Sequence, residues 1–333
     1  MKTGKLYRRA PWLAPRALAF ALGALALAAH AGPACSDRGA KSPEARCEAL
    51  AFGGRERTYR LYVPARLPAA APLLVVLHGG GGGGASMESL TLRGLNRRAD
   101  EDGVLVAYPD GVGHGWNDGR RDLKSKSVEE SVDDVGFLRA LVDAISRRYP
   151  LDRERIFVTG ISNGGMMTLR LACDASDLFH GFVAVAASLG ADLAPRCRPS
   201  APRPLALIDG TEDPLVPFAG GAVNVLGSRR GSVIGALATF AMFRGAAHCK
   251  DVDDEPPLDR VAGDGTALVV RRATGCVDDA RIVLYEIDGG GHAWPGGLRY
   301  ARKWLIGRVS QELDATDEIW RFLGLGAGRR GPV

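Results

Sequence analysis

A serine between two glycines, in the run VTGISNGGMMTLRLA (residues 158–172), is the residue of this sequence best placed to do chemistry. The apolar residues 155–160 before it have the pattern of a buried strand, and helix-forming residues follow it. The spacing G-x-S-x-G allows a tight turn from strand to helix that exposes the serine hydroxyl. Ser162 is therefore a candidate nucleophile, and an ordinary helix N-cap serine is the alternative.

A serine hydroxyl is a weak nucleophile at neutral pH, so the hypothesis requires a histidine base and a carboxylate to orient it. His292 is the best candidate base, because it follows the last clear strand in the glycine-rich run IDGGGHAWPGG. The run PLALIDGTEDPLVPF offers Asp209 at a strand end, and Glu212 and Asp213 in the loop behind it. A loop carboxylate reaches an imidazole more easily, which favours Asp213, although the pattern alone leaves Asp209 open. The order serine, acid, histidine is that of α/β-hydrolases.

The tetrahedral intermediate of such a reaction needs hydrogen-bond donors for its oxyanion. The run VVLHGGGGGGAS (residues 75–86) places six glycines directly after an apolar strand, so backbone amides can approach a ligand closely. We expect the donors to be the amides of Gly79, Gly80, Gly81 and Asn163. A nucleotide phosphate loop is disfavoured because the run lacks the Lys-Ser/Thr pair, and a flexible linker because the run follows a buried strand.

Two tryptophans lie near these segments. Trp116 is in the long loop YPDGVGHGWNDGRRD (residues 108–122), and Trp294 is two residues beyond His292. Loops after the carboxyl ends of parallel strands bind ligands in open α/β sheets. Trp116 and Trp294 are therefore candidates for an aromatic wall of a substrate site, and burial beneath the loops is the equal alternative.

The segments around these residues alternate between strand and helix patterns. Strand patterns occur at 48–63, as two strands around Gly53-Gly54, and at 72–78, 104–109, 155–160, 181–188, 204–210 and 281–289. Helix patterns occur at 86–103 and 131–149. Continuous apolar strands separated by helices predict a mostly parallel, doubly wound α/β sheet covered by helices on both faces. Residues 244–280 look like an excursion from it, closed by a disulfide.

The first 31 residues have the pattern of a secretory signal. Five basic residues precede or begin an apolar run, and Ala29-His30-Ala31 fits a cleavage site, so we expect cleavage after Ala31 and a secreted or periplasmic protein without a stable membrane anchor. Removing this segment takes away five of the 43 basic residues and none of the 38 acidic ones, so the remaining chain is formally neutral. The composition therefore does not indicate nucleic acid as a partner.

Cysteine usage agrees with export. All six cysteines follow the cleavage site, and an even number in an exported chain favours disulfides over metal ligation. We expect pairing between neighbours in sequence: Cys35 with Cys47, Cys173 with Cys197, and Cys249 with Cys276. C-x-x-C spacing is absent from the sequence, which disfavours a zinc site. Catalysis by a serine, a histidine and a carboxylate needs no metal and no organic cofactor, so we expect neither.

Together, the motifs resemble the secreted esterase family that groups poly(3-hydroxybutyrate) depolymerases with feruloyl and acetylxylan esterases. The resemblance rests on LHGGGG, YPDG with WND, VDDVGFLRALVD before ERIFVTGISNGGMM, DGTEDPLVPF and GGGHAWPG. It covers roughly residues 48–323 and implies an α/β-hydrolase fold there. Around this domain we expect the signal peptide at 1–31, an N-terminal segment at 32–47 and, from its glycine- and arginine-rich composition, a flexible tail at 324–333. The resemblance also implies the triad Ser162, Asp213 and His292, although the family usually has His-Gly where this chain has Asp209-Gly210.

The function expected from these residues is hydrolysis of carboxylic esters through an acyl-enzyme. The substrate is expected to be small or polymeric: a hydroxybutyrate-like ester, or a hydroxycinnamoyl or acetyl ester of a plant polysaccharide. Acyl transfer to another alcohol would use the same triad, and a non-catalytic binding protein or a peptidase on the same scaffold are further alternatives. The sequence does not give the oligomeric state.

Overall fold

The computed structural model describes residues 45–121 and 124–326. Its strands are β1 (Ala45–Phe52), β2 (Arg55–Tyr62), β3 (Ala71–Leu77), β4 (Leu105–Pro109), β5 (Leu151–Ile161), β6 (Phe182–Val185), β7 (Leu205–Gly210), β8 (Gly220–Val225), β9 (Ser228–Ile234), β10 (Asp251–Asp254), β11 (Ala267–Thr274) and β12 (Ile282–Asp288). Its α-helices are α1 (Gly84–Leu90), α2 (Gly94–Asp102), α3 (Lys126–Glu129), α4 (Asp134–Ser146), α5 (Asn163–Asp174), α6 (Ala236–Ala246), α7 (Lys303–Ile306) and α8 (Ala315–Phe322).

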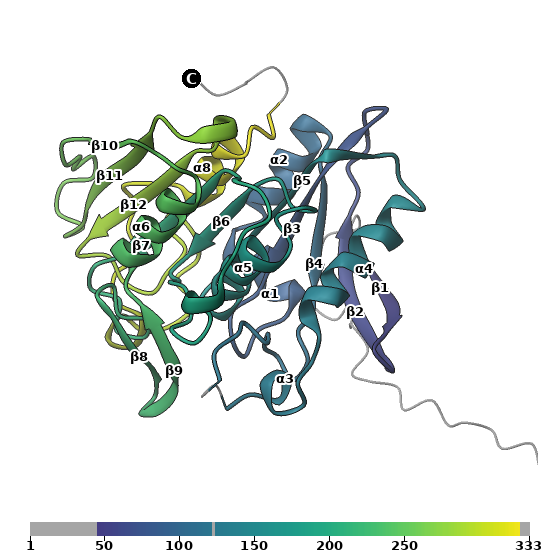
Figure 1. The fold of residues 1–333 in the computed structure, drawn as a ribbon, viewed down its shortest axis with the longest axis horizontal. Coiled ribbons are helices and arrows are strands. Elements are labelled where there is room, and N and C mark those ends of the chain that lie inside the picture. The colour runs from purple at the N-terminus through teal and green to yellow at the C-terminus, as the bar shows by residue number, and fades with distance from the viewer. Residues whose placement is uncertain (1–44, 122–123, 327–333) are drawn as a thin grey trace, which may run out of the picture. The chain divides into compact units, whose positions relative to one another are not determined.

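Ten of these strands form one sheet in the order β1-β2-β4-β3-β5-β6-β7-β12-β11-β10 (Figure 1). The six central strands, from β4 to β12, are parallel. The two strands at each edge pair antiparallel. Because parallel strands end at the same side of a sheet, the loops that follow β5, β7 and β12 all start from one edge.

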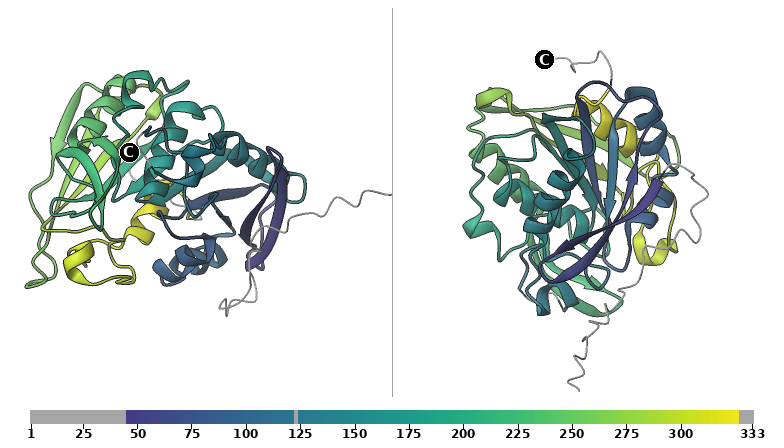
Figure 2. Two further views of the ribbon diagram at one scale, coloured as in Figure 1. Left: turned by 90° about the horizontal axis from the view of Figure 1, so that it is seen from below. Right: turned by 90° about the vertical axis from the view of Figure 1, so that its right-hand side faces the viewer.

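Both faces of the sheet are buried, as the continuous apolar strands predict. In β3, Leu73, Val75 and Leu77 belong to the core shared with helices α4, α5 and α6. Leu74 and Val76 belong to the core shared with α1, α2 and α8. Figure 2 shows the sheet between these two layers of helices. The predicted doubly wound α/β sheet, and with it the α/β-hydrolase fold, is confirmed.

Two predicted segments differ from the structure. The single helix expected at 86–103 is two helices, α1 and α2, because Leu92 and Arg93 between them have left-handed backbone angles, with φ of 50° and 55°. Residues 244–280 are not an excursion: they contain β10 and β11, which extend the sheet beyond β12. The separate β8–β9 hairpin had no counterpart among the predicted strands.

The ends of the folded part also differ from the expected boundaries. Strand β1 already begins at Ala45, three residues before the predicted domain. Leu325 is buried against the α8 side of the sheet, so ordered packing continues into the predicted tail. The proposed signal peptide, residues 1–31, lies outside the described residues, and no helix within them is long and apolar enough to span a membrane.

Two predicted disulfides are present, Cys173–Cys197 and Cys249–Cys276. The first joins the end of α5 to the segment before β7, and the second joins the turn after α6 to the end of β11. Cys35 lies outside the described residues, so its pairing with Cys47 stays a prediction.

Candidate active site

Ser162 lies at the turn between β5 and α5, with backbone angles φ 57° and ψ −122°. A β-carbon makes this conformation unfavourable, and such strain persists only where the surroundings enforce it. Here the Ser162 amide donates to the Val185 carbonyl at 2.9 Å, and the Ser162 carbonyl accepts from Met166 at 2.8 Å. Ser162 occupies the N-cap position, yet its side chain makes no capping hydrogen bond. The geometry therefore favours an exposed hydroxyl over an ordinary cap.

Glycines surround this turn because there is no space for side chains. A β-carbon on Gly160 would lie 2.6 Å from the Gly164 carbonyl carbon and 2.8 Å from the Leu77 oxygen. One on Gly164 would lie 2.5 Å from the His78 oxygen and would also overlap Leu77. A β-carbon on Gly165 would lie 2.6 Å from that of Ala187. The tight turn inferred from G-x-S-x-G is thus a close approach of α5 to the ends of β3 and β6.

His292 and Asp213 form a buried pair. The imidazole Nδ1 and the Asp213 Oδ2 are 2.7 Å apart, and the two side chains are 3% and 2% exposed. The other carboxylate oxygen accepts from the amides of Leu215 and Val216 at 2.7 and 2.9 Å. Because a carboxylate is an acceptor, the contact assigns a proton to Nδ1, so in the neutral imidazole Nε2 carries no proton and can accept one.

Asp209, the carboxylate that the sequence left as an alternative, does not contact the histidine. Its Oδ1 accepts from the Ala187 amide at 2.7 Å, and its Oδ2 is buried without a partner among the described residues. Burial raises the pKa of Asp209 well above its usual value, and the nearby charge of Asp213 adds to this. The geometry therefore selects Asp213 as the partner of His292.

The predicted oxyanion donors separate into two groups. A β-carbon on Gly79 would lie 3.5 Å from that of Ser162, and one on Gly80 would lie 3.9 Å from that of Asn163, so these two glycines run beside the Ser162 turn. Asn163 is the first residue of α5, where amides have no acceptor within the helix. The Gly81 amide, however, donates to the His114 carbonyl at 2.7 Å. Gly81 is therefore removed from the set of candidate donors.

The expected aromatic wall is wrong, because neither tryptophan is exposed. Trp116 and Trp294 are both 0% exposed. Trp116 donates its indole N–H to the His78 carbonyl at 2.9 Å, and Trp294 donates to the Thr316 hydroxyl at 3.1 Å. Each indole satisfies its polar atom inside the protein, which is the buried alternative for these residues.

His78, in the run of residues that follows β3, was not among the predicted site residues. Its imidazole is fully buried, with Nδ1 2.8 Å from the Gly79 carbonyl oxygen and Nε2 accepting from the Gly111 amide at 2.9 Å. The Gly82 amide donates to the same Gly79 oxygen at 3.0 Å. Since the carbonyl and N–H of one peptide unit point in opposite directions, these contacts fix the direction of the Gly80 amide.

The three candidate triad residues come from different parts of the chain. Ser162 follows β5, Asp213 follows β7 and His292 follows β12. In the sheet β7 is the direct neighbour of β12, and only β6 separates it from β5. The sheet order thus brings together residues far apart in sequence. Among the described residues, no group of three or more His, Cys, Asp or Glu side chains is arranged to hold a metal ion.

The crowded turn gives a stability prediction. Gly164→Ala is expected to lower the free energy of unfolding by about 3 kcal/mol, because the new methyl overlaps two backbone carbonyls. Gly245→Ala is the matched control: this glycine is in α6 with open space around its Cα, and alanine should leave stability unchanged or raise it by about 0.5–1 kcal/mol. Urea unfolding of both variants measures the difference, and equal stabilities would contradict the tight turn.

The buried Oδ2 of Asp209 gives a prediction about how the stability of the protein depends on pH. A raised pKa means that Asp209 of the folded protein binds a proton that the unfolded chain has released, so the contribution of Asp209 to stability falls as the pH rises above about 4. Asp209→Asn lacks this loss and should exceed the wild type by at least about 1 kcal/mol at pH 8. The advantage should shrink towards pH 4. A difference that does not change with pH in urea unfolding would refute the assignment.

Comparisons with known proteins agree with this fold. Residues 69–217 match the family model described as serine aminopeptidase, S33. A putative esterase, NocK of Nocardia uniformis subsp. tsuyamanensis, is 34% identical over 284 residues, covering 82% of this chain and 81% of that protein.

Two further relatives are longer proteins that the chain covers in part. Feruloyl esterase B of Piromyces equi is 29% identical over 234 residues, which is 67% of this chain and 40% of the esterase. A poly(3-hydroxybutyrate) depolymerase of Ralstonia pickettii is 32% identical over 189 residues, which is 53% of this chain and 37% of the depolymerase. The chain belongs to this esterase family of α/β-hydrolases and is an esterase-type hydrolase.

Proposed function

We propose that the protein is a serine carboxylesterase in which Ser162 is the nucleophile, His292 the general base and Asp213 the residue that orients the base. The observation that carries the proposal is the buried 2.7 Å contact between His292 and Asp213, on the edge of the sheet where the strained Ser162 turn lies. A histidine held by a carboxylate through Nδ1 has Nε2 available for a substrate proton, which is the requirement for activating a serine.

The proposed reaction runs in two halves. Nε2 of His292 takes the Ser162 proton as the hydroxyl oxygen attacks the ester carbonyl, and the resulting oxyanion is stabilised by the amides of Asn163 and of Gly79 or Gly80. The protonated histidine then gives its proton to the departing alcohol, which leaves an acyl-enzyme. Water then attacks the acyl carbon and gives its proton to the same base. The bond between the acyl carbon and the Ser162 oxygen breaks, His292 returns the proton to that oxygen, and the carboxylic acid leaves. Asp213 orients the imidazole and stabilises the imidazolium.

The proposed substrates are esters of hydroxybutyrate, hydroxycinnamate or acetate. The support is the motif pattern together with the relatives described as a feruloyl esterase and a poly(3-hydroxybutyrate) depolymerase. Because one fold hosts many substrates, the choice among these acyl groups is an analogy. We also propose export to the periplasm or the medium, supported by the signal-like residues 1–31 and by the two disulfides.

The first functional prediction concerns Ser162. Purified protein is expected to hydrolyse at least one ester of a panel: p-nitrophenyl acetate and butyrate, methyl ferulate, acetylated xylan and a 3-hydroxybutyrate oligomer. Ser162→Ala should lower kcat by about 10⁴-fold or more, because the nucleophile is gone while the fold remains. An alanine variant as active as the wild type would contradict the proposal.

The same panel distinguishes the other reactions. A rate that rises with an added acceptor alcohol would indicate acyl transfer, and cleavage of an aminoacyl p-nitroanilide in place of every ester would indicate a peptidase. A wild type that neither turns over any substrate nor reacts with an organophosphonate would be a binding protein.

The two aspartates give the second functional prediction. Asp213→Asn should lower kcat by about 10³- to 10⁴-fold, because the amide no longer holds the histidine in the required tautomer. Asp209→Asn should stay within about threefold of the wild type, since Asp209 does not touch His292. Steady-state kinetics on the preferred ester of the panel compares the two isosteric changes directly. If Asp209→Asn is the variant that loses activity, the assignment of the acid is wrong.

A further inference from the structure

The side chain of Asn163, the residue after the proposed nucleophile, is held by a set of buried hydrogen bonds. Its Oδ1 accepts from the Trp116 amide at 2.7 Å. Its Nδ2 donates to the Trp116 carbonyl at 3.0 Å and to Asp118 Oδ2 at 2.7 Å. A carboxamide can be turned over by half a rotation, and these contacts with opposite roles permit only one orientation.

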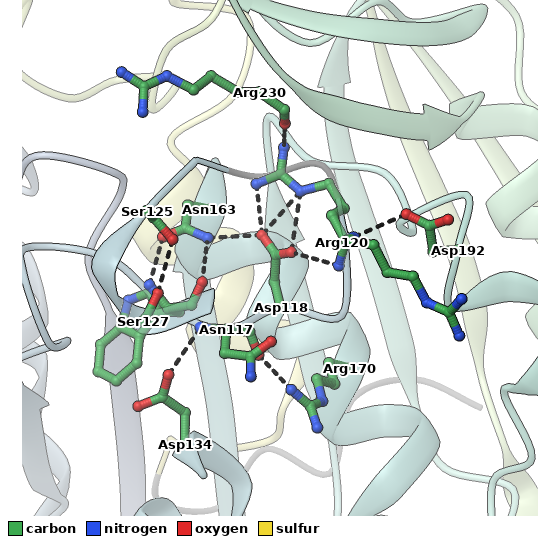
Figure 3. Close-up of polar contacts among 12 residues, drawn as sticks. Asn117, Asp118, Arg120, Ser125, Ser127, Asp134, Asn163, Arg170, Asp192 and Arg230 are labelled. Atoms are coloured by element: carbon green, nitrogen blue, oxygen red, sulfur yellow. Dashed lines mark hydrogen bonds and ion pairs between the residues drawn. The ribbon is translucent and has the colours of Figure 1, made fainter. Parts of the chain in front are cut away.

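Asp118 lies between Asn163 and Arg120 (Figure 3). The Arg120 guanidinium donates Nη2 to Asp118 Oδ2 at 2.6 Å and Nε to both carboxylate oxygens at 3.0 and 3.1 Å. The two side chains are 2% and 0% exposed. Removing two charges from water is costly, and apolar residues of similar volume often replace such a pair without loss of stability. A buried ion pair in this place therefore needs a reason other than stability.

The guanidinium of Arg120 also contacts the β8–β9 hairpin. Its Nη1 donates to the Arg230 carbonyl in β9 at 2.5 Å. The aliphatic part of the side chain lies between two glycines: a β-carbon on Gly190 would be 2.9 Å from Cγ, and one on Gly231 would be 3.1 Å from Cδ. Arg120 is thus fixed along its whole length and holds Asp118 in one position.

The same loop holds the other group of oxyanion donors. Gly111 donates to His78, which contacts the Gly79 carbonyl, and the His114 carbonyl accepts from Gly81. Residues 110–120 therefore connect the glycine-rich run after β3 with the start of α5. The distance between two oxyanion donors must be set to a few tenths of an ångström, because a donor contributes only within hydrogen-bond reach of the charged oxygen.

We propose that Asp118 and Arg120 are positioning residues: they hold Asn163 so that its backbone amide meets the oxyanion of the transition state. This inference rests on the proposed serine-esterase function. Asp118 orients the carboxamide of Asn163 directly, and Arg120 acts through Asp118. Neither touches the substrate, so their contribution belongs to the transition state and not to substrate binding.

The experiment compares Asp118→Asn, Asp118→Ala, Arg120→Met and the double variant Asp118→Ala/Arg120→Met. Loss of a whole oxyanion donor costs about 10²- to 10³-fold in kcat, so a displaced donor should cost about 10- to 30-fold in Asp118→Ala and Arg120→Met. KM should stay within about twofold, and Asp118→Asn, which keeps an acceptor for Asn163, should lose least. The double variant should equal Asp118→Ala, because both changes act on one linkage.

Two further readouts separate positioning from folding. Phenylboronic acid forms a tetrahedral adduct with a serine, so its inhibition constant should rise by the same factor as kcat falls. The backbone order parameter of Asn163, from ¹⁵N relaxation, should fall in Asp118→Ala. The matched control is the buried pair Arg60–Glu88, 2.8 Å apart with side chains 2% and 6% exposed, in which Glu88 accepts from Arg60 and Asn96. Glu88→Gln should lower stability while leaving kcat of the folded protein unchanged.

The outcomes test the two claims separately. The proposed function fails if wild-type turnover does not depend on Ser162. The positioning role is overturned if Asp118→Ala changes stability or KM alone, or if its boronate inhibition constant and the order parameter of Asn163 match those of the wild type. The order parameter needs no turnover, so it tests the positioning role even in a protein that cleaves none of the esters.

Discussion

The positive φ of Ser162 is the constraint on which the rest of the site depends. This angle turns the chain from β5 into α5 within one residue and presents the hydroxyl at the edge of the sheet. It is possible only because α5 approaches the ends of β3 and β6 so closely that Gly160, Gly164 and Gly165 cannot carry side chains. The strain is offset by packing of the whole helix against the sheet, where most residues of α5 are buried.

The order of the strands in the sheet brings the other candidate residues close to that turn. Seven strands and about 130 residues separate Ser162 from His292 along the chain, yet β5 and β12, which precede them, lie within three positions of each other in the sheet. The acid comes from the strand beside the base, so the Asp213–His292 pair is set by one parallel register, with Glu286 opposite Asp209 and Ile287 opposite Gly210. The loop at 110–120 then joins the glycine-rich run after β3 to the Ser162 turn, so contacts between distant segments hold the candidate site together.

The sequence predicted what depends on local pattern. Apolar strands, the G-x-S-x-G turn and the candidates Ser162 and His292 follow from spacing alone, and the central strands lie where they were expected. It did not predict what depends on tertiary contact. The break between α1 and α2 is at Leu92 and Arg93, and neither leucine nor arginine is a residue type that predicts a left-handed backbone. The tryptophans look like ligand contacts until burial is known. In the sequence, Asp118 and Arg120 are two charged residues in a loop. Their opposite charges, two residues apart, were the only indication that they form an ion pair.

The most direct test of the central claim is a crystal structure of the protein after reaction with an ester-mimicking organophosphonate. The account predicts phosphorus bonded to the Ser162 oxygen, with the phosphoryl oxygen about 2.7–3.1 Å from the amides of Asn163 and of Gly79 or Gly80. It also predicts Nε2 of His292 beside the remaining oxygen or the leaving-group position. Phosphorus on another residue, or a phosphoryl oxygen directed into solvent away from these amides, would contradict the account.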